Sequence, residues 1–396
     1  MDDRVPVMLT YQIPYGCQSI EQADIDAVVQ VLQSPWLTQG PTIARFENAM
    51  AEHCQAEFAV AVCNATAALH IACLAAGLGP GDRLWTSPNT FVASANCGRY
   101  CGAEVDFVDI DPLTLNLDAR LLAVKLEVAE ATGQLPKVVV AVAFAGQSCD
   151  MHTLAALAER YAFTLIEDAS HAVGASYLGR PVGCGEFAAM TIFSFHPVKI
   201  ITSAEGGMVL TNRPELAERM RRLRSHGITG DQAQMEVPDH GLWYYQQLEL
   251  GFNYRMTDLH AALGLSQMAR LDSFVAKRRQ LAARYDRLLA DLPLVLPVAQ
   301  AGAESAWHLY VVRLRLDEIS VTQREVFDTL RATGIGVNLH YIPVHLQPYY
   351  RKLGFEEGDF PEAERYFSEA VSLPLFPLLS DEQQDYVVEQ LRSIVG

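Results

Sequence analysis

The sequence Val138-Val139-Val140-Ala141-Val142-Ala143-Phe144 is a continuous β-branched and apolar run. A second such run, Phe163-Thr164-Leu165-Ile166, comes after the helical stretch 151–161. Runs of this length and composition suit strands that are buried on both faces, as the strands of a parallel sheet are. Helix-like and strand-like patterns alternate through the first 250 residues. This alternation predicts an α/β fold with a mainly parallel central sheet and helices on both of its faces.

The patterns on either side of these runs extend the same organisation. Residues 189–193 and 208–210 continue the series of strands. Ser19 to Leu32 carries an apolar stripe at helical spacing, and Ser19 with Gln22 is typical of a capping box at a helix start. Residues 230–250 interrupt the alternation with polar and aromatic residues, and we interpret them as an irregular excursion.

The last third of the chain has the pattern of a smaller α+β unit. It contains a helical stretch at 258–277, a strand at 309–314, a helix at 323–333 and a closing helix from Asp381. We therefore expect a large domain over residues 1–255, which includes the N-terminal segment, and a small C-terminal domain over residues 256–396.

Composition excludes several classes of protein. The chain has 396 residues, with 47 Asp and Glu against 30 Lys and Arg, and its net charge of -17 argues against a nucleic-acid partner. Residues 1–12 contain no apolar run typical of an export signal, and no stretch approaches the ~18 apolar residues of a membrane span. The eight cysteines show no C-x-x-C spacing. We expect a cytoplasmic protein whose cysteines are reduced and act as small apolar residues.

Two segments near predicted strand ends could bind an anion and a cation. The turn at 63–68 leads into a helix, so its amide groups and the Thr66 hydroxyl could hold a phosphate; an ordinary helix cap is the alternative. Asp168 comes just after the apolar run ending at Ile166, and its carboxylate could hold a proton on a pyridine nitrogen such as that of pyridoxal phosphate. Alternatively, Asp168 caps the next turn and His171 is a core histidine.

A third segment, Phe193-Ser194-Phe195-His196-Pro197-Val198-Lys199, comes after another predicted strand. A lysine in apolar surroundings is costly to bury with its charge, so the pKa of Lys199 should fall and its amine become nucleophilic. Ser194 could bind phosphate. The alternative is a surface lysine in a loop. Close by, Gly206 and Gly207 would permit a close backbone approach.

Taken together and in this order, these segments resemble the DegT/DnrJ/EryC1/StrS family of sugar aminotransferases. The resemblance implies the fold-type I architecture of pyridoxal-phosphate-dependent transferases. It also implies pyridoxal 5'-phosphate as cofactor, with pyridoxamine phosphate as the intermediate form. Further stretches that carry the resemblance are Ile13-Pro14-Tyr15, Leu37-Thr38-Gln39-Gly40, Thr90-Phe91-Val92-Ala93, Gly251-Phe252-Asn253-Tyr254-Arg255-Met256 and His340-Tyr341-Ile342-Pro343-Val344-His345.

The resemblance also implies roles for residues that match the family's motifs. Lys199 matches the lysine that forms the Schiff base, and Asp168 matches the partner of the pyridinium nitrogen. Ser194, Thr66 and Ala67 match the residues that hold the cofactor phosphate.

Four further roles come from the same resemblance. Phe91 falls where the family stacks an aromatic ring on the cofactor, and His171 falls near the cofactor's 3-hydroxyl group. Asn253 matches a residue that reaches the phosphate in the other subunit, which implies a homodimer with shared active sites. The segments that line the sugar-nucleotide site in relatives contain Tyr15, Thr38, Gln39, Arg255, His340 and Tyr341.

Within the family, the Phe-Ser-Phe-His run before Lys199 and the segment 168–172 are similar to those of the PseC-type enzymes. This likeness implies transfer of an amino group from L-glutamate to C4 of a UDP-linked 4-keto-6-deoxy-N-acetylhexosamine, a step of pseudaminic acid-type nucleotide-sugar biosynthesis. The reaction would be ping-pong, with Lys199 as the general base.

Several alternatives stay open. The nucleotide could be GDP or dTDP, and the protein could be a sugar dehydratase or a non-catalytic regulator that binds the cofactor. The dehydratase relatives carry His where this chain has Lys199. A zinc enzyme using His340 and His345 lacks the H-E-x-x-H or Cys-pair spacing of such sites, so we expect no metal.

Overall fold

The computed structural model describes residues 12–238 and 240–396. Residues 1–11, where we expect no export signal, lie outside the described part. The largest element is a seven-stranded sheet. Its strands have the spatial order β1 (Phe58–Val62), β9 (Gly207–Thr211), β8 (Met190–Ser194), β5 (Thr164–Asp168), β4 (Val138–Val142), β2 (Arg83–Thr86) and β3 (Glu104–Phe107).

Five neighbouring strands of this sheet, from β8 to β3, run parallel. The register sets Asp168 beside Val142 of β4 and Ile192 of β8, so the carboxyl ends of these strands share one edge. The predicted mainly parallel sheet is confirmed. In contrast, β9 runs antiparallel between β1 and β8, although its apolar sequence continues the same series.

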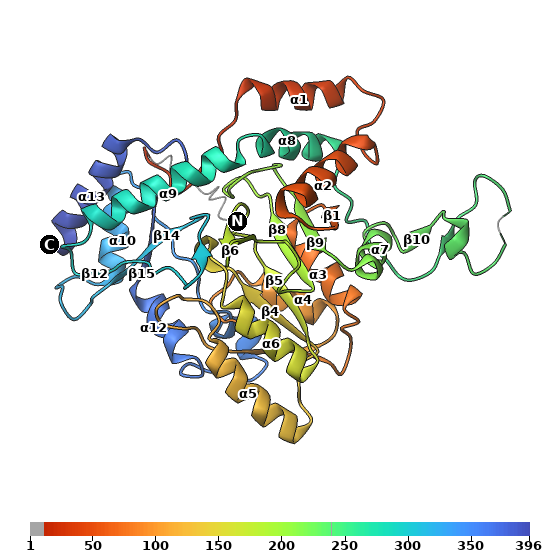
Figure 1. The fold of residues 1–396 in the computed structure, drawn as a ribbon. Helices are drawn as coiled ribbons and strands as arrows, with labels where there is room; N and C mark the ends of the chain where they lie inside the picture. The colour runs from red at the N-terminus through yellow and green to blue at the C-terminus, as the bar shows by residue number, and fades with distance from the viewer. Residues whose placement is uncertain (1–11, 239) are drawn as a thin grey trace, which may run out of the picture.

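Helices cover both faces of the sheet, as predicted (Figure 1). Alternate residues of a strand point to opposite faces, which explains why the strands are apolar at nearly every position. Val140 packs toward the helices of one face and Val139 toward those of the other. The first face is covered by α3 (Ala65–Ala75), α4 (Ala93–Tyr100) and α7 (Pro214–Leu223), and the second by α5 (Ala119–Thr132), α6 (Met151–Tyr161), α2 (Pro41–Cys54) and α8 (Asp258–Met268).

A second hydrophobic core forms around a small antiparallel sheet of the C-terminal unit. The helix α9 (Leu271–Leu288) begins against the large core and continues into the small one, so it connects the two units (Figure 1). The domain boundary at 255/256 stays a prediction. The small unit contains β12 (Leu294–Val295), β14 (Tyr310–Leu314), β15 (Ala370–Leu373), α10 (Gln323–Ala332), α11 (Pro348–Arg351), α12 (Pro361–Glu369) and α13 (Asp381–Val395).

Two predicted helices differ in detail. The first, α1 (Gln22–Leu32), starts three residues later than predicted, and its capping box is formed by Glu21 and Asp24. Ser19 is used elsewhere, because its carbonyl accepts hydrogen bonds from Gln267 and Arg270. The stretch 258–277 divides into α8 and α9.

The excursion at 230–250 forms an arm that projects from the body at the right of Figure 1. Two short strands, β10 (Ile228–Thr229) and β11 (Gln246–Gln247), pair at its base, and its tip exposes Leu242 and Trp243. The Glu249 carboxylate accepts hydrogen bonds from Arg219 Nε at 3.2 Å and Arg222 Nε at 3.3 Å. The base of the arm is therefore fixed to α7.

All eight cysteines are free, and all but Cys17 and Cys63 are buried, as expected of small apolar residues. Within the described part of the chain, no helix combines the length and the apolar character that crossing a membrane requires. The remaining short strands are β6 (Ser176–Tyr177), β7 (Arg180–Pro181) and β13 (Ala303–Glu304).

Candidate active site

A cavity of about 570 Å³ lies where β4, β5 and β8 end. Val142, Asp168 and Ser194, the last residues of these three strands, all line it. The opposite wall comes from the segment 338–341 of the C-terminal unit. Crevices at the carboxyl ends of parallel strands are where open α/β sheets bind ligands, and this volume suits a ligand of cofactor size.

Lys199 lies in the loop after β8 and points its amine into this cavity. Protein surrounds the amine, while the side chain keeps some accessible area because it faces the cavity. Burial lowers the pKa of Lys199 to about 8, against a smaller opposing effect of the Asp168 charge. At neutral pH the fraction of free amine is therefore roughly two orders of magnitude larger than for an ordinary lysine. A surface-loop lysine is excluded.

Asp168 ends β5 and is buried at the cavity wall. Its Oδ2 accepts a hydrogen bond from Ser94 Oγ at 2.6 Å, and its Oδ1 accepts one from Ser170 Oγ at 2.6 Å and one from Ser170 N at 3.2 Å. The carboxylate thus caps its own turn and also borders the cavity. These hydrogen bonds hold it in one orientation.

The amino end of α3 forms another part of the wall. Asn64 caps the helix by accepting a hydrogen bond from Ala67 N at 2.8 Å, whereas the first-turn amides of Ala65 and Thr66 have no acceptor within the helix. Ala65 and Thr66 line the cavity, and Ser194 lies in the same wall. The turn is both an ordinary helix cap and a place where an anion could bind.

Aromatic and imidazole side chains complete the site. His171 is buried, and its Nε2 lies 3.0 Å from the Tyr341 hydroxyl. Burial first, and then the Lys199 charge, hold the pKa of His171 well below its usual range, so this imidazole is neutral. The exposed Phe91 ring lies at the cavity rim, 6.2 Å from that of Tyr341, and Tyr15 and His340 line the same space.

Sequence reasoning missed His308, a residue of the cavity wall. It lies two residues before the start of β14, is 4% exposed, and places Nε2 3.4 Å from Lys199 Nζ. Ser94 and Asn338 were also missed. None of them belongs to a local motif, and a lone histidine before an apolar strand is the only signal that His308 offers.

Five predicted residues do not reach this cavity within one chain. Ala67 points away from it, with its amide bound to Asn64. Thr38 pairs with Thr257 in an isolated bridge beside Gln39. Asn253 pairs in the same way with Ser225, whose hydroxyl accepts a hydrogen bond from Arg255 Nη1 at 3.1 Å.

His340 and His345 each contact a different side chain. His340 Nδ1 lies 2.8 Å from Ser372 Oγ, and His345 Nε2 lies 2.8 Å from Glu364 Oε1. Over residues 12–238 and 240–396, no three His, Cys, Asp or Glu side chains gather in a way that could hold a metal ion.

The cavity fits a phosphorylated pyridoxal chemically. An enclosed amine with a lowered pKa can bond to an aldehyde, and a fixed carboxylate can pair with a ring nitrogen. The free amides at the start of α3 can receive a phosphate. In addition, His171 Nδ1 is buried without a hydrogen-bond partner, as expected of a wall that faces a polar ligand.

Comparison with known proteins finds similarity over nearly the whole chain. Residues 18–392 match the model of the DegT/DnrJ/EryC1/StrS aminotransferase family. The spore coat polysaccharide biosynthesis protein SpsC of Bacillus subtilis (strain 168) is 41% identical over 386 residues, which cover 97% of each chain.

Solved structures are similar as well. The PLP-form of the putative sugar aminotransferase Spr1654 from Streptococcus pneumoniae has a TM-score of 0.86 at 30% identity, covering 97% of this chain and 98% of that one. Its PMP-form has a TM-score of 0.87 at 30% identity, covering 96% and 98%. Helicobacter pylori PseC, an aminotransferase involved in the biosynthesis of pseudoaminic acid, has a TM-score of 0.87 at 29% identity, covering 97% of this chain and 99% of that one.

Proposed function

The chain belongs to the DegT/DnrJ/EryC1/StrS aminotransferase family, and on this basis we propose that it transfers an amino group from L-glutamate to C4 of a UDP-linked 4-keto-6-deoxy-N-acetylhexosamine, using pyridoxal 5'-phosphate. The observation that carries this proposal is the Lys199 amine, enclosed in a cavity between the Asp168 carboxylate and the amino end of α3. The likeness to the pseudoaminic acid enzyme supports the choice of sugar.

The residues around the cavity have distinct tasks. Bound pyridoxal phosphate supplies an electron sink next to the nitrogen that is transferred. Thr66, Ser194 and the first amides of α3 would hold its phosphate, and Asp168 would keep its ring nitrogen protonated. Phe91 would cover the ring, and His171 would lie near its 3-hydroxyl group.

Lys199 moves protons in both halves of the reaction. With a pKa of about 8, its amine is partly free at neutral pH and can take the proton from the α-carbon of glutamate. In the second half it gives a proton to C4 of the sugar. A lysine at this position also disfavours the dehydratase alternative, whose known members carry histidine there.

A homodimer with shared sites would complete the cavity. No arginine of the described residues lines it, although a pyrophosphate-linked sugar and a dicarboxylate both need cations. The arm exposes Leu242 and Trp243, which are costly to leave in water. We infer that the arm and the segment with Asn253 and Arg255 pack against a second copy, where Asn253 reaches the phosphate. Thr38 and Gln39 would join the same sugar-nucleotide site.

Subunit mixing tests the shared site. Lys199→Ala and Asn253→Asp are each expected to be inactive as homodimers. If Asn253 serves the partner, a mixed dimer has one doubly damaged site and one intact site, so activity returns after exchange. If exchange is verified by mass and no activity returns, Asn253 serves its own chain.

The reaction itself is tested with glutamate and a panel of nucleotide-linked 4-keto-sugars, with products read by mass. We expect amination of the UDP-linked sugar and 2-oxoglutarate in equal amount. Lys199→Ala is the matched control and should yield neither. Amination of a GDP- or dTDP-linked sugar alone would replace UDP, loss of a hydroxyl would indicate a dehydratase, and a cofactor that never responds to glutamate would indicate a binding role. The free cysteines support a reducing compartment such as the cytoplasm.

A further inference from the structure

His308 is the nearest polar partner that the described residues offer to the Lys199 amine. Its Nε2 lies 3.4 Å from Lys199 Nζ, and its ring lies 4.4 Å from that of His171 between ring centroids. Burial, reinforced by the Lys199 charge, holds the pKa of His308 well below its usual range. A neutral imidazole has one nitrogen that can accept a hydrogen bond, so Nε2 can accept from the lysine when the amine is protonated.

The backbone around His308 is held on both sides. Arg278 Nη1 donates to the carbonyls of Trp307 and His308, each at 3.2 Å, and to that of Leu375 at 2.9 Å. On the other side, the Gly146 carbonyl accepts a hydrogen bond from Ala306 N at 2.9 Å. A fully buried arginine that donates to three carbonyls thus fixes the backbone from which the His308 imidazole projects.

Gly146 itself allows this approach. Its φ is +109°, and a methyl group on it would lie 2.9 Å from His308 N and from Trp307 N. The loop after β4 can therefore lie directly against the His308 segment only because no side chain stands there.

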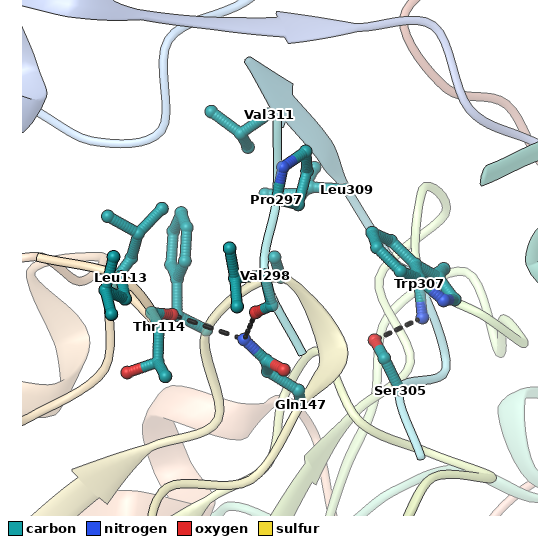
Figure 2. A pocket seen from close by; sticks show the side chains of 12 residues that line it. Leu113, Thr114, Gln147, Pro297, Val298, Ser305, Trp307, Leu309 and Val311 are labelled. Atoms are coloured by element: carbon teal, nitrogen blue, oxygen red, sulfur yellow. Dashed lines mark hydrogen bonds between the residues drawn. The ribbon is translucent and has the colours of Figure 1, made fainter. Parts of the chain in front are cut away.

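Trp307 anchors the same segment (Figure 2). It lines a small apolar hollow of about 20 Å³ together with Val298 and Leu309, and its amide donates to Ser305 Oγ at 2.9 Å. Gln147 closes this hollow by donating to the carbonyls of Thr114 at 3.3 Å and Val298 at 3.1 Å. The hollow is too small for a cofactor and instead holds the residue next to His308 in place.

Few ionisable groups besides His308 lie around the Lys199 amine. Asp168 and Glu205 are the carboxylates that line the same cavity, together with the exposed His196, while His171 and His340 are buried imidazoles with lowered pKa values. Arg278 and Cys17 border a second small space behind the lysine. Of all these groups, only His308 lies within hydrogen-bond distance of Nζ.

We propose that His308 is a positioning residue for Lys199, and that its Nε2 accepts a hydrogen bond from the protonated amine and so fixes the direction of the amine and its readiness to carry a proton. This inference rests on the proposed function of Lys199 as the reacting amine. The tautomer that leaves Nε2 free to accept carries its proton on Nδ1, which is buried without a hydrogen-bond partner, so the contact with Lys199 is the one hydrogen bond that the described residues give this imidazole.

The full-length protein without cofactor tests this directly. The protein is labelled with a trace of acetic anhydride at pH values from roughly 6 to 10, a range that brackets an amine with a lowered pKa. Mass spectrometry then measures the acetylation of the peptide that contains Lys199. The plot of its acetylation rate against pH should have its midpoint at about pH 8. His308→Phe fills the space but cannot accept a hydrogen bond, so the midpoint should fall by about one pH unit. His308→Gln keeps an acceptor and should stay nearer the wild type. His70→Gln, at a buried histidine outside the cavity, is the control and should leave the midpoint unchanged.

Two outcomes would overturn the proposal. One is a wild-type midpoint in His308→Phe. The other is an equal shift in the Phe and Gln variants, which would mean that His308 only fills space. If the Phe variant does not fold, nitrogen-15 NMR of the imidazoles decides the question: the His308 signals should titrate with Lys199 in the wild type and lose that step in Lys199→Met. Because labelling needs neither cofactor nor sugar, failure here is distinguishable from failure of the proposed activity.

Discussion

Gly207→Ala should damage the phosphate end of the site through one methyl group. Gly207 begins β9 and lies directly against the turn into α3. A methyl group there would stand 2.5 Å from three backbone atoms, Asn64 C, Asn64 O and Ala65 N. Carbon contacts below 3.0 Å are essentially never seen, so the turn must move by about half an ångström. β9 cannot retreat, because it is hydrogen-bonded to β1 on one side and β8 on the other.

The size of the effect derives from overpacking, which costs about 1 to 3 kcal/mol at a site that cannot relax. We expect the free energy of unfolding to fall by about that amount. If half of this strain, about 0.5 to 1.5 kcal/mol, appears at the phosphate cradle, the affinity for pyridoxal 5'-phosphate should fall roughly 2- to 12-fold. Denaturant unfolding measures the first quantity, and titration of the cofactor-free protein by absorbance measures the second.

Gly79→Ala is the matched control, because a methyl group there would meet nothing within 4 Å. It should leave both quantities near the wild type. Wild-type stability and affinity in Gly207→Ala would refute the reasoning, because they would show that the turn can accept a methyl group in spite of the short backbone distances.

Three further variants replace ionisable residues in or beside the site. Lys199→Ala should abolish the visible absorbance change that glutamate produces and lower turnover by about 10²- to 10⁴-fold while circular dichroism stays unchanged; full activity would mean that another lysine reacts. Asp168→Asn should still bind the cofactor but turn over roughly 100-fold more slowly, and a wild-type rate would reduce Asp168 to a cap for its own turn. Burial raises the pKa of Glu167 to about 7, so the wild type loses stability as pH rises from 4.5 through 7. Glu167→Gln lacks this loss and should be more stable than the wild type by about 1 to 3 kcal/mol above pH 7, with no difference below pH 4.5; equal differences at both pH values in urea unfolding would contradict this.

The parts of the site that sequence reasoning found are those next to strand ends. The apolar runs that became β4 and β5 are recognisable because a buried parallel strand is apolar on both faces. Asp168 and Ser194 end such strands and Lys199 lies five residues beyond Ser194, and parallel strands bring the residues at their carboxyl ends to one edge. The residues of the proposed reacting centre can thus be recognised in short segments.

Other features depend on partners that are distant along the chain. An apolar run does not reveal the direction of its strand, so the antiparallel placement of β9 could not be predicted. Ser19 has the local sequence of a helix cap, yet contacts with Gln267 and Arg270, about 250 residues away, take it out of that role. Here tertiary contacts outweigh a local preference worth about 1 kcal/mol.

The sequence alone determined the mainly parallel sheet, its covering helices, the family, and the proposed amine and carboxylate of the site, because periodicity and strand-end position are local properties. Only the tertiary structure decided which side chain touches that amine. His308 lies 109 residues from Lys199 along the chain. Its position depends on Arg278 of α9, which binds the His308 carbonyl, and on Gly146, whose lack of a side chain permits the close approach. Neither residue lies near His308 in the sequence. Contacts of this kind depend on how helices, strands and loops pack against one another in three dimensions, and no single segment of the sequence determines that packing.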